Sequence, residues 1–363
     1  MKTLLRLLAT LWAGGIGLVG CWVAAPLFSP AATAEVELVA ALPAPNEFAR
    51  SFEPVPPGAS LVPGLAAPAV GWRTPGEAEV DMAVAPPAEW LPPDWFPPSK
   101  AILVLSAMDD EGPTDGPTVK SRSAFVYDLD AGRVLYQKHP DDPRPVASIT
   151  KVVSALAYAS TDPNPDREVV IGPEQYPTRS GARSRLSTGD VTSGIDLLGA
   201  ALVSSDNRAA LGLAAAADMH LEQFVGRMNA VSVELGMTRS SWVDPSGLED
   251  ENLSTARDIA KATVAVATHP MLAPVASAPH WDLWRKNKNY VRRLGSTDRL
   301  SGRDDLVVET AKTGYTDTAR YCFTTVLRTD SGHRLVISLL GADGKMTRWA
   351  DVNRILSWVE RQG

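Results

Sequence analysis

Ser148 and Lys151 lie three residues apart in the stretch RPVASITKVVSALAYAS, residues 144–160. On a helix, this spacing places both side chains on one face. The neighbouring residues are apolar, and a lysine in apolar surroundings must pair with another group, extend to the surface or lose its proton. A neutral amine can take the proton of a serine hydroxyl, so the two residues could act as nucleophile and general base.

Two further polar clusters interrupt apolar stretches. Ser205-Asp206-Asn207 lies between two helical runs, and Lys312-Thr313-Gly314 comes just ahead of a predicted strand. Each cluster alone is a weak signal, because S-x-x-K or S-x-N is expected roughly once by chance in a chain of this length. Together, in this order, S-x-x-K, S-D-N and K-T-G form the known signature of penicillin-binding proteins and class A β-lactamases.

The resemblance extends well beyond the three motifs. The stretch MNAVSVELGMTRSSWVDPSGLEDENLSTARDIAKA is similar to the one that follows the second motif in low-molecular-mass D-alanyl-D-alanine carboxypeptidases. AKTGYTDTARYCF and LLGADGKMTRWADVNRILSWVE resemble that family's C-terminal strands and last helix. The match covers about residues 120–360. SSDNRAA, and a chain that ends straight after the last helix, resemble the endopeptidase branch, of the penicillin-binding protein seven type.

Physical reasoning and the resemblance together assign the catalytic roles. Burial and the nearby positive charge of Lys312 would lower the pKa of Lys151, which would then act as the base for Ser148. The chain has five histidines, and none lies in a polar cluster of the catalytic type. The resemblance implies that Ser205 relays a proton to the leaving amine. It also implies that Asn207 holds Lys151 and a substrate amide.

The substrate-binding residues follow from the third motif and the last helix. The backbone N–H of Ser148 would form an oxyanion hole, and the resemblance makes the N–H of Tyr315 its second donor. Thr313 would bind substrate, and Gly314 would let the strand approach the substrate backbone closely. In carboxypeptidase relatives an arginine at the place of Arg348 helps to hold the terminal carboxylate of the substrate. An exposed arginine at a helix end is the alternative for Arg348.

The resemblance implies a serine DD-peptidase that acts on peptidoglycan stems or crosslinks and is inhibited by β-lactams. A class A-like β-lactamase is one alternative, but those enzymes need a glutamate in an E-x-x-L-N loop, and EDENL at 249–253 lacks that arrangement. A non-catalytic β-lactam-sensing or cell-wall-binding module is another, yet such a module need not retain every motif residue, as this chain does. No histidine or cysteine pair has metal-ligand spacing in 119–363, so neither metal nor cofactor is expected.

The N-terminal third differs in composition from the rest. Residues 26–117 hold 13 acidic residues against 3 basic ones and 18 of the 29 prolines, whereas residues 118–363 hold 29 acidic and 30 basic residues. We therefore expect a Pro-rich acidic tether over 21–118 and a peptidase domain over 119–363. No basic cluster indicates nucleic-acid binding.

Residues 1–20 have the outline of a secretory signal. LVGC resembles a bacterial lipobox, so Cys21 would be lipidated. The protein would then contact the membrane only through its N-terminus. Cleavage after Ala34, within the small-x-small sequence ATA, would release the chain instead, and an uncleaved anchor is the third possibility. All three place the domain outside the cytoplasm, in the periplasm.

The patterns predict an α+β domain of the DD-peptidase/β-lactamase type. Alternating strands are expected near residues 123–138 and again after the third motif, with helices between them, including an all-helical subregion. The terminal strands should therefore meet in one antiparallel sheet flanked by helices. A short β element is also expected at 101–107.

Overall fold

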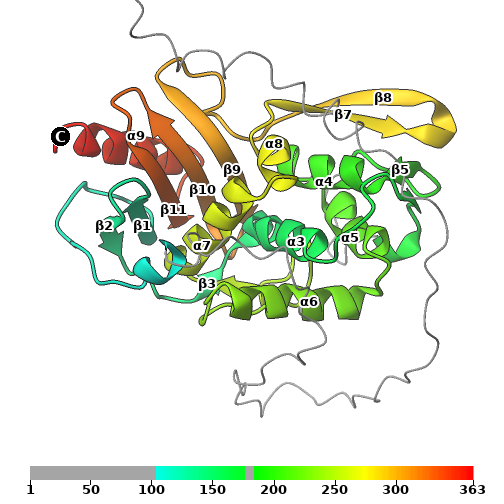
Figure 1. Cartoon of the computed structure of the whole chain (residues 1–363), viewed down its shortest axis with the longest axis horizontal. Helices are drawn as coiled ribbons and strands as arrows, with labels where there is room; N and C mark the ends of the chain where they lie inside the picture. The colour runs from blue at the N-terminus through cyan, green and yellow to red at the C-terminus, as the bar shows by residue number, and fades with distance from the viewer. Residues whose placement is uncertain (1–103, 176–183, 363) are drawn as a thin grey trace, which may run out of the picture. The chain divides into compact units, whose positions relative to one another are not determined.

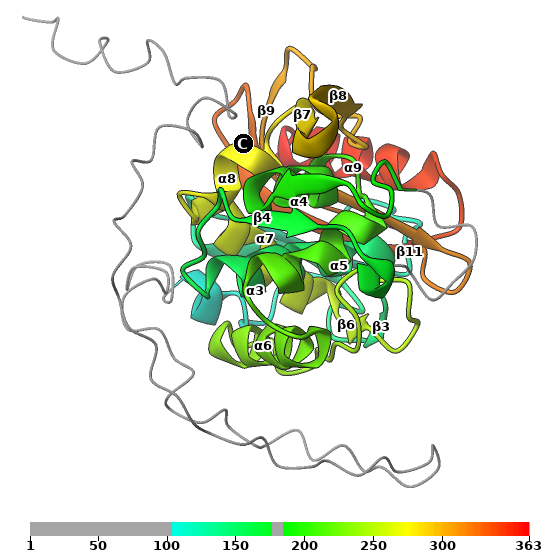
Figure 2. The same cartoon turned by 90° about the vertical axis from the view of Figure 1, so that its right-hand side faces the viewer.

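The computed structural model describes residues 104–175 and 184–362 (Figure 1). The predicted signal sequence, Cys21, Ala34 and most of the predicted tether lie outside these ranges. The described residues form a five-stranded antiparallel sheet with helices on both faces (Figures 1 and 2), which confirms the predicted α+β class. No helix in these ranges is long and apolar enough to cross a membrane.

The central sheet has the strand order β2-β1-β11-β10-β9. Its strands are β1 (Ser123–Asp128), β2 (Arg133–Lys138), β9 (Leu306–Thr316), β10 (Arg320–Thr329) and β11 (Arg334–Ala342). β1 pairs along its length with β11, with Val126 opposite Ile337, so the strands from the two ends of the domain meet as predicted. Successive side chains point to opposite faces: Phe125 lies in one apolar core and Val126 in the other.

Helices cover both faces of the sheet. The helices are α3 (Thr150–Ala159), α4 (Gly194–Val203), α5 (Asn207–Ala216), α6 (Leu221–Glu234), α7 (Ala256–Thr268), α8 (Leu272–Ala276) and α9 (Thr347–Val359). α9 packs on β10 and β11 from one side, and α7 contacts β1, β9, β10 and β11 from the other. α3 packs against α4, α5, α6 and α7, so the second motif and the nucleophile share one helical layer.

The two helical runs expected on either side of the second motif are α4 and α5. α4 ends at Val203 and α5 starts at Asn207, because the serines and the aspartate between them favour caps and turns over helix interior. α6 ends at Glu234, and Gly236 then takes a φ of +67°, the left-handed conformation that commonly follows a helix.

The hairpin of β7 (His280–Arg285) and β8 (Tyr290–Gly295) was not predicted. Its buried Trp281 packs on α4, where a Cβ on Gly199 would lie 2.2 Å from the indole ring, and the indole N–H donates to Asp196. The basic residues of this stretch obscure the alternation of Trp281 and Leu283, so the pattern alone did not indicate strands.

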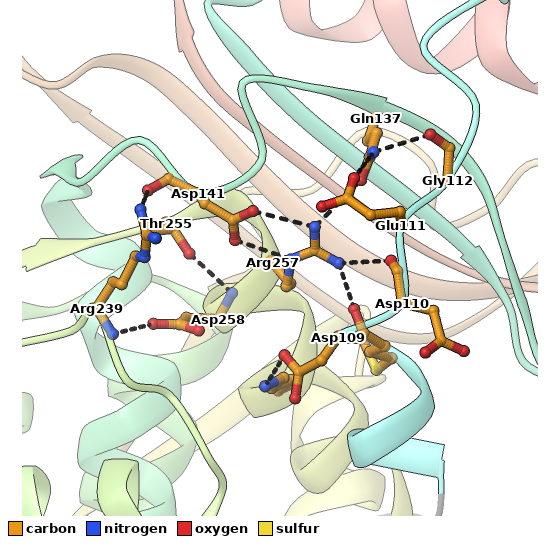
Figure 3. Close-up of polar contacts among 12 residues, drawn as sticks. Asp109, Asp110, Glu111, Gly112, Gln137, Asp141, Arg239, Thr255, Arg257 and Asp258 are labelled. Atoms are coloured by element: carbon orange, nitrogen blue, oxygen red, sulfur yellow. Dashed lines mark hydrogen bonds and ion pairs between the residues drawn. The ribbon is translucent and has the colours of Figure 1, made fainter.

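Residues 104–107 are helical, which corrects the expected β element there. The Arg257 side chain on α7 holds the residues just after this helical turn (Figure 3). Its guanidinium donates to the carbonyl oxygens of Met108 at 2.5 Å and Asp110 at 3.1 Å. It also pairs with Asp141 at 2.8 Å. Met108 is fully buried. Packing of the chain therefore begins before residue 119.

Candidate active site

Ser148 lies in a short 3₁₀ turn, η2 (Ala147–Ile149), that leads directly into α3. Lys151 in the first turn of α3 is fully buried, and its Nζ lies 2.8 Å from Ser148 Oγ. The three-residue spacing thus puts both groups on one face, as the sequence predicts. Ala147, immediately before the serine, has a φ of +50°, a conformation that costs a non-glycine residue about 1 kcal/mol or more.

The Lys151 amine has two further neighbours. Its Nζ lies 2.8 Å from Asn207 Oδ1 and 2.5 Å from the carbonyl oxygen of Ser246. Burial lowers the pKa of Lys151 to about 8, and the negative charges of Asp244 and Asp206 partly oppose that effect. A lysine with this pKa carries a free amine in an appreciable fraction of molecules near neutral pH.

The second and third motifs meet at Ser205. Lys312 Nζ donates to Ser205 Oγ at 2.8 Å and to the carbonyl oxygen of Thr313 at 2.9 Å. The Lys312 pKa falls well below its ordinary value, first because of burial and then because of the positive charges of Lys151 and Arg348. Lys151 and Lys312 are both buried, and a positive charge on one disfavours a positive charge on the other. A state in which one of the two amines is neutral is therefore favoured.

The start of α5 fixes Asn207. Asp206 is the N-cap residue, and its side chain accepts the backbone N–H of Ala209 at 3.1 Å. Ser205 just before it has a φ of +61°. The strained turn and the cap together present the Ser205 hydroxyl to Lys312 and the Asn207 side chain to Lys151.

The K-T-G motif lies inside β9, which corrects its predicted place ahead of a strand. β9 is an edge strand of the sheet. Gly314 is required where β9 passes the nucleophile, because a Cβ there would lie 2.7 Å from the carbonyl oxygen of Val146 and 3.2 Å from the Ile149 nitrogen. The third motif is thereby held against the turn that carries Ser148.

Tyr315 and Arg348 differ in burial, although both contact the ring of Tyr321. Tyr315 is 46% exposed, and its ring contacts that of Tyr321 at 4.3 Å. Arg348 is buried at the start of α9, not exposed at a helix end, and its Nη1 donates to the carbonyl oxygens of Gly314 at 3.1 Å and Cys322 at 3.0 Å. Arg348 therefore fixes the backbone of the third motif.

Sequence reasoning missed the loop that supplies Ser246. The D-P-S-G sequence at 244–247 marks a turn, but nothing in the residue types indicates that its backbone reaches Lys151. Thr297 was missed as well. It joins the end of α4 to the third motif, because its backbone N–H donates to the carbonyl oxygen of Val203 and its hydroxyl accepts from Thr313 at 2.7 Å.

The arrangement of three motifs around two buried lysines agrees with a comparison against protein families. Residues 110–344 match the model described as D-alanyl-D-alanine carboxypeptidase, peptidase S11. The chain belongs to the peptidase S11 family of D-alanyl-D-alanine carboxypeptidases. The members of this family are enzymes, and the motif residues of this S11 peptidase occupy the positions just described.

Two relatives of this S11 peptidase are named D-alanyl-D-alanine endopeptidase. The one from Escherichia coli is 34% identical over 67% of this chain and 78% of its own length. The one from Pseudomonas aeruginosa is 34% identical over 73% of this chain and 82% of its own. Among solved structures, penicillin-binding protein D2 of Listeria monocytogenes in its cefotaxime-bound form is similar, with a TM-score of 0.58 and 26% identity over 67% of this chain and 98% of that one.

Proposed function

We propose that this chain hydrolyses D-Ala-containing peptide bonds of peptidoglycan through an acyl-enzyme on Ser148, and that penicillin inhibits it by acylating the same residue. The observation that carries this proposal is the environment of the Lys151 amine. A free amine has two N–H groups and one lone pair. Asn207 Oδ1 and the Ser246 carbonyl oxygen accept the two N–H groups, so the lone pair is left for the proton of Ser148.

The reaction follows from these positions. Ser148 Oγ bonds to the carbonyl carbon of the D-Ala residue while its proton passes to Lys151. The C–N bond then breaks, and the leaving amine takes the proton of Lys151, relayed through Ser205, whose hydroxyl accepts a hydrogen bond from Lys312. Water attacks the ester, releasing the product acid and returning the proton to Ser148. The backbone N–H groups of Ser148 and Tyr315 stabilise the oxyanion in both steps.

The edge of β9 provides the substrate surface. An extended peptide can add to an exposed sheet edge through main-chain hydrogen bonds, and β9 is such an edge beside Ser148. Thr313 binds the carboxylate next to the scissile bond. Arg348 supports this subsite through the Gly314 carbonyl and contributes positive charge to it.

Crosslinks are the proposed substrate, since both relatives at 34% identity are named endopeptidases. The test is product analysis by mass spectrometry after incubation with purified crosslinked peptidoglycan fragments. Conversion of dimers to monomers is expected. Release of D-Ala from pentapeptides alone would assign a carboxypeptidase, and no cleavage of either would refute the proposal. Labelled penicillin should map to the peptide containing Ser148, and Ser148→Ala should abolish both labelling and cleavage.

The enzyme works outside the cytoplasm, where peptidoglycan lies. We propose that lipidation of Cys21 anchors it to a membrane there, with cleavage after Ala34 as the alternative. Mass spectrometry of the mature N-terminus and fractionation of cells that carry Cys21→Ala test this. A membrane-bound wild type and a soluble variant are expected. A soluble wild type that begins at Glu35 would contradict lipidation.

A further inference from the structure

The loop between α6 and α7 is organised around the side chain of Asp244. Its carboxylate accepts the backbone N–H groups of Ser246 at 2.8 Å and Gly247 at 3.0 Å, and it also accepts the Ser246 hydroxyl. Asn252 donates to the same carboxylate at 2.6 Å. One acidic side chain thus fixes the backbone on both sides of Ser246.

This loop contacts the catalytic helix at several points. The Ser246 carbonyl oxygen lies 2.5 Å from Lys151 Nζ, and the Pro245 carbonyl accepts the Ser154 hydroxyl at 2.7 Å, almost one turn further along α3. Gly247, with a φ of +79°, passes so close that a Cβ there would lie 2.1 Å from the carbonyl oxygen of Ala147. Any change in the loop backbone would therefore move an acceptor of Lys151 or the turn that carries Ser148.

The ends of the loop are held independently of Asp244. Ser241 and Leu253 form a β-bridge. Asp258 on α7 accepts the backbone N–H of Arg239 at 2.9 Å (Figure 3). The same carboxylate accepts the Ser240 hydroxyl at 2.8 Å. The loop therefore has a fixed base, and Asp244 determines the path of its tip.

We infer that Asp244 is a positioning residue for acylation: it places the Ser246 carbonyl on Lys151 and supplies a negative charge on the loop that faces this amine. This inference rests on the proposed role of Lys151 as the base. Asp244 itself neither touches Ser148 nor takes part in proton transfer.

The charges around Lys151 allow the electrostatic effect of Asp244 to be separated from its effect on the loop structure. Asp244 faces it from the loop, Asp206 from the N-cap of α5, and Lys312 from β9, with Arg348 on α9 acting on Lys312. Asp244 and Asp206 raise the pKa of Lys151 against the effect of burial. Removal of the Asp244 charge would lower that pKa further, so the free amine would persist at lower pH.

The test is the pH dependence of acylation by labelled penicillin in the full chain, for the wild type, Asp244→Asn and Asp244→Ser. In both variants, the acidic limb of the profile of acylation rate against pH should move to lower pH by about half to one unit. This shift is expected whether or not the maximal rate at high pH changes. Asp128→Asn is the matched control, because this carboxylate also organises a turn, through the N–H groups of Asp130 and Ala131, but lies on β1. Its limb should coincide with that of the wild type.

A limb at the wild-type position in either folded Asp244 variant would overturn the inference, as would failure of both variants to fold, since Asp244 would then serve stability alone. Ser148→Ala distinguishes this from failure of the proposed function. If Ser148→Ala is still labelled, the acyl-enzyme proposal is wrong. If it is not labelled and the limb of the Asp244 variants is unmoved, only the role of Asp244 is wrong.

Discussion

Gly314 lies so close to Val146 that the methyl group of an alanine at position 314 would push β9 away from the turn that carries Ser148. A Cβ on Gly314 would lie 2.7 Å from the Val146 carbonyl oxygen. We predict that Gly314→Ala slows acylation by penicillin roughly 10- to 100-fold, because a displacement of about 1 Å at a reacting centre has that effect. The free energy of unfolding should fall by about 1–3 kcal/mol, as for other overpacked sites.

Gly226→Ala is the matched control for Gly314→Ala. Gly226 lies within α6, and a Cβ there would meet nothing within 4 Å. Its acylation rate should equal that of the wild type, and its stability should rise by up to about 1 kcal/mol because alanine favours a helix. A Gly314→Ala enzyme with the wild-type acylation rate would show that the contact with Val146 does not position the site.

The acylation rate of the wild type should rise with pH and level off above about pH 8. The free amine of Lys151 is the active form, and burial lowers its pKa to about 8. Below that pKa the amine is protonated, so the rate should fall about tenfold for each further pH unit. Stopped-flow measurement of acylation between pH 5.5 and 9.5 gives the profile. A rate independent of pH over this range would exclude Lys151 as the base.

Asn207→Asp should move the same profile in the opposite direction from Asp244→Asn. The new carboxylate would replace the amide oxygen that lies 2.8 Å from Lys151 Nζ. An adjacent negative charge favours the ammonium form and so raises the pKa of Lys151. Acylation at pH 7 should fall at least about tenfold and recover in part at higher pH. Asn207→Ala is the control, because it removes the acceptor without adding charge and should not move the limb upward.

The sequence predicted the motif side chains because their chemistry demands particular residue types. The base, the nucleophile and the amide acceptor each need a particular type of side chain. Lys151, Ser148 and Asn207 supply these types. The Ser246 carbonyl is different, since any residue supplies a backbone oxygen, and the fold alone brings it across 95 positions to Lys151. For the same reason, nothing in the residue types indicates a role for Asp244.

Two local errors in the fold also have physical causes. The third motif is predicted to lie just ahead of a strand, but Gly314 lies within β9. A glycine, which is rare inside strands, stands there because the close approach to Val146 leaves no room for a side chain. Thr255 and Asp258 have the spacing of a capping box at the start of α7. Only the Thr255 half of it is present, and the Asp258 carboxylate binds Ser240 and the backbone of Arg239 instead. Tertiary contacts overrode the local pattern at both places.

Arg348→Met should reduce stability as well as activity. The substitution would leave the buried carbonyl oxygens of Gly314 and Cys322 without their donor, at a cost of about 1–3 kcal/mol each. Acylation should slow for peptides with either a free or an amidated terminal carboxylate, because the β9 backbone shifts for both. An effect confined to the free carboxylate, with unchanged thermal unfolding, would mean that Arg348 serves only to bind substrate.

Arg257→Ala should release the chain at the start of the domain while sparing catalysis. Arg257 is buried, binds the carbonyl oxygens of Met108 and Asp110, and pairs with Asp141 (Figure 3). Each of the two carbonyl oxygens that lose their donor should cost about 1–3 kcal/mol, whereas the half-exposed Asp141 adds little. Residues 104–116 should become sensitive to protease.

The Arg257 prediction is checked by chemical unfolding, limited proteolysis with mass spectrometry, and penicillin acylation of the same preparation. Arg293→Ala is the control, since its pair with Asp282 is exposed and should leave all three measurements unchanged. Acylation by folded Arg257→Ala should match the wild type, because Arg257 contacts none of the groups around Lys151. A slower rate at unchanged stability would mean instead that α7 transmits the position of this segment to the Asp244 loop, through Asp258.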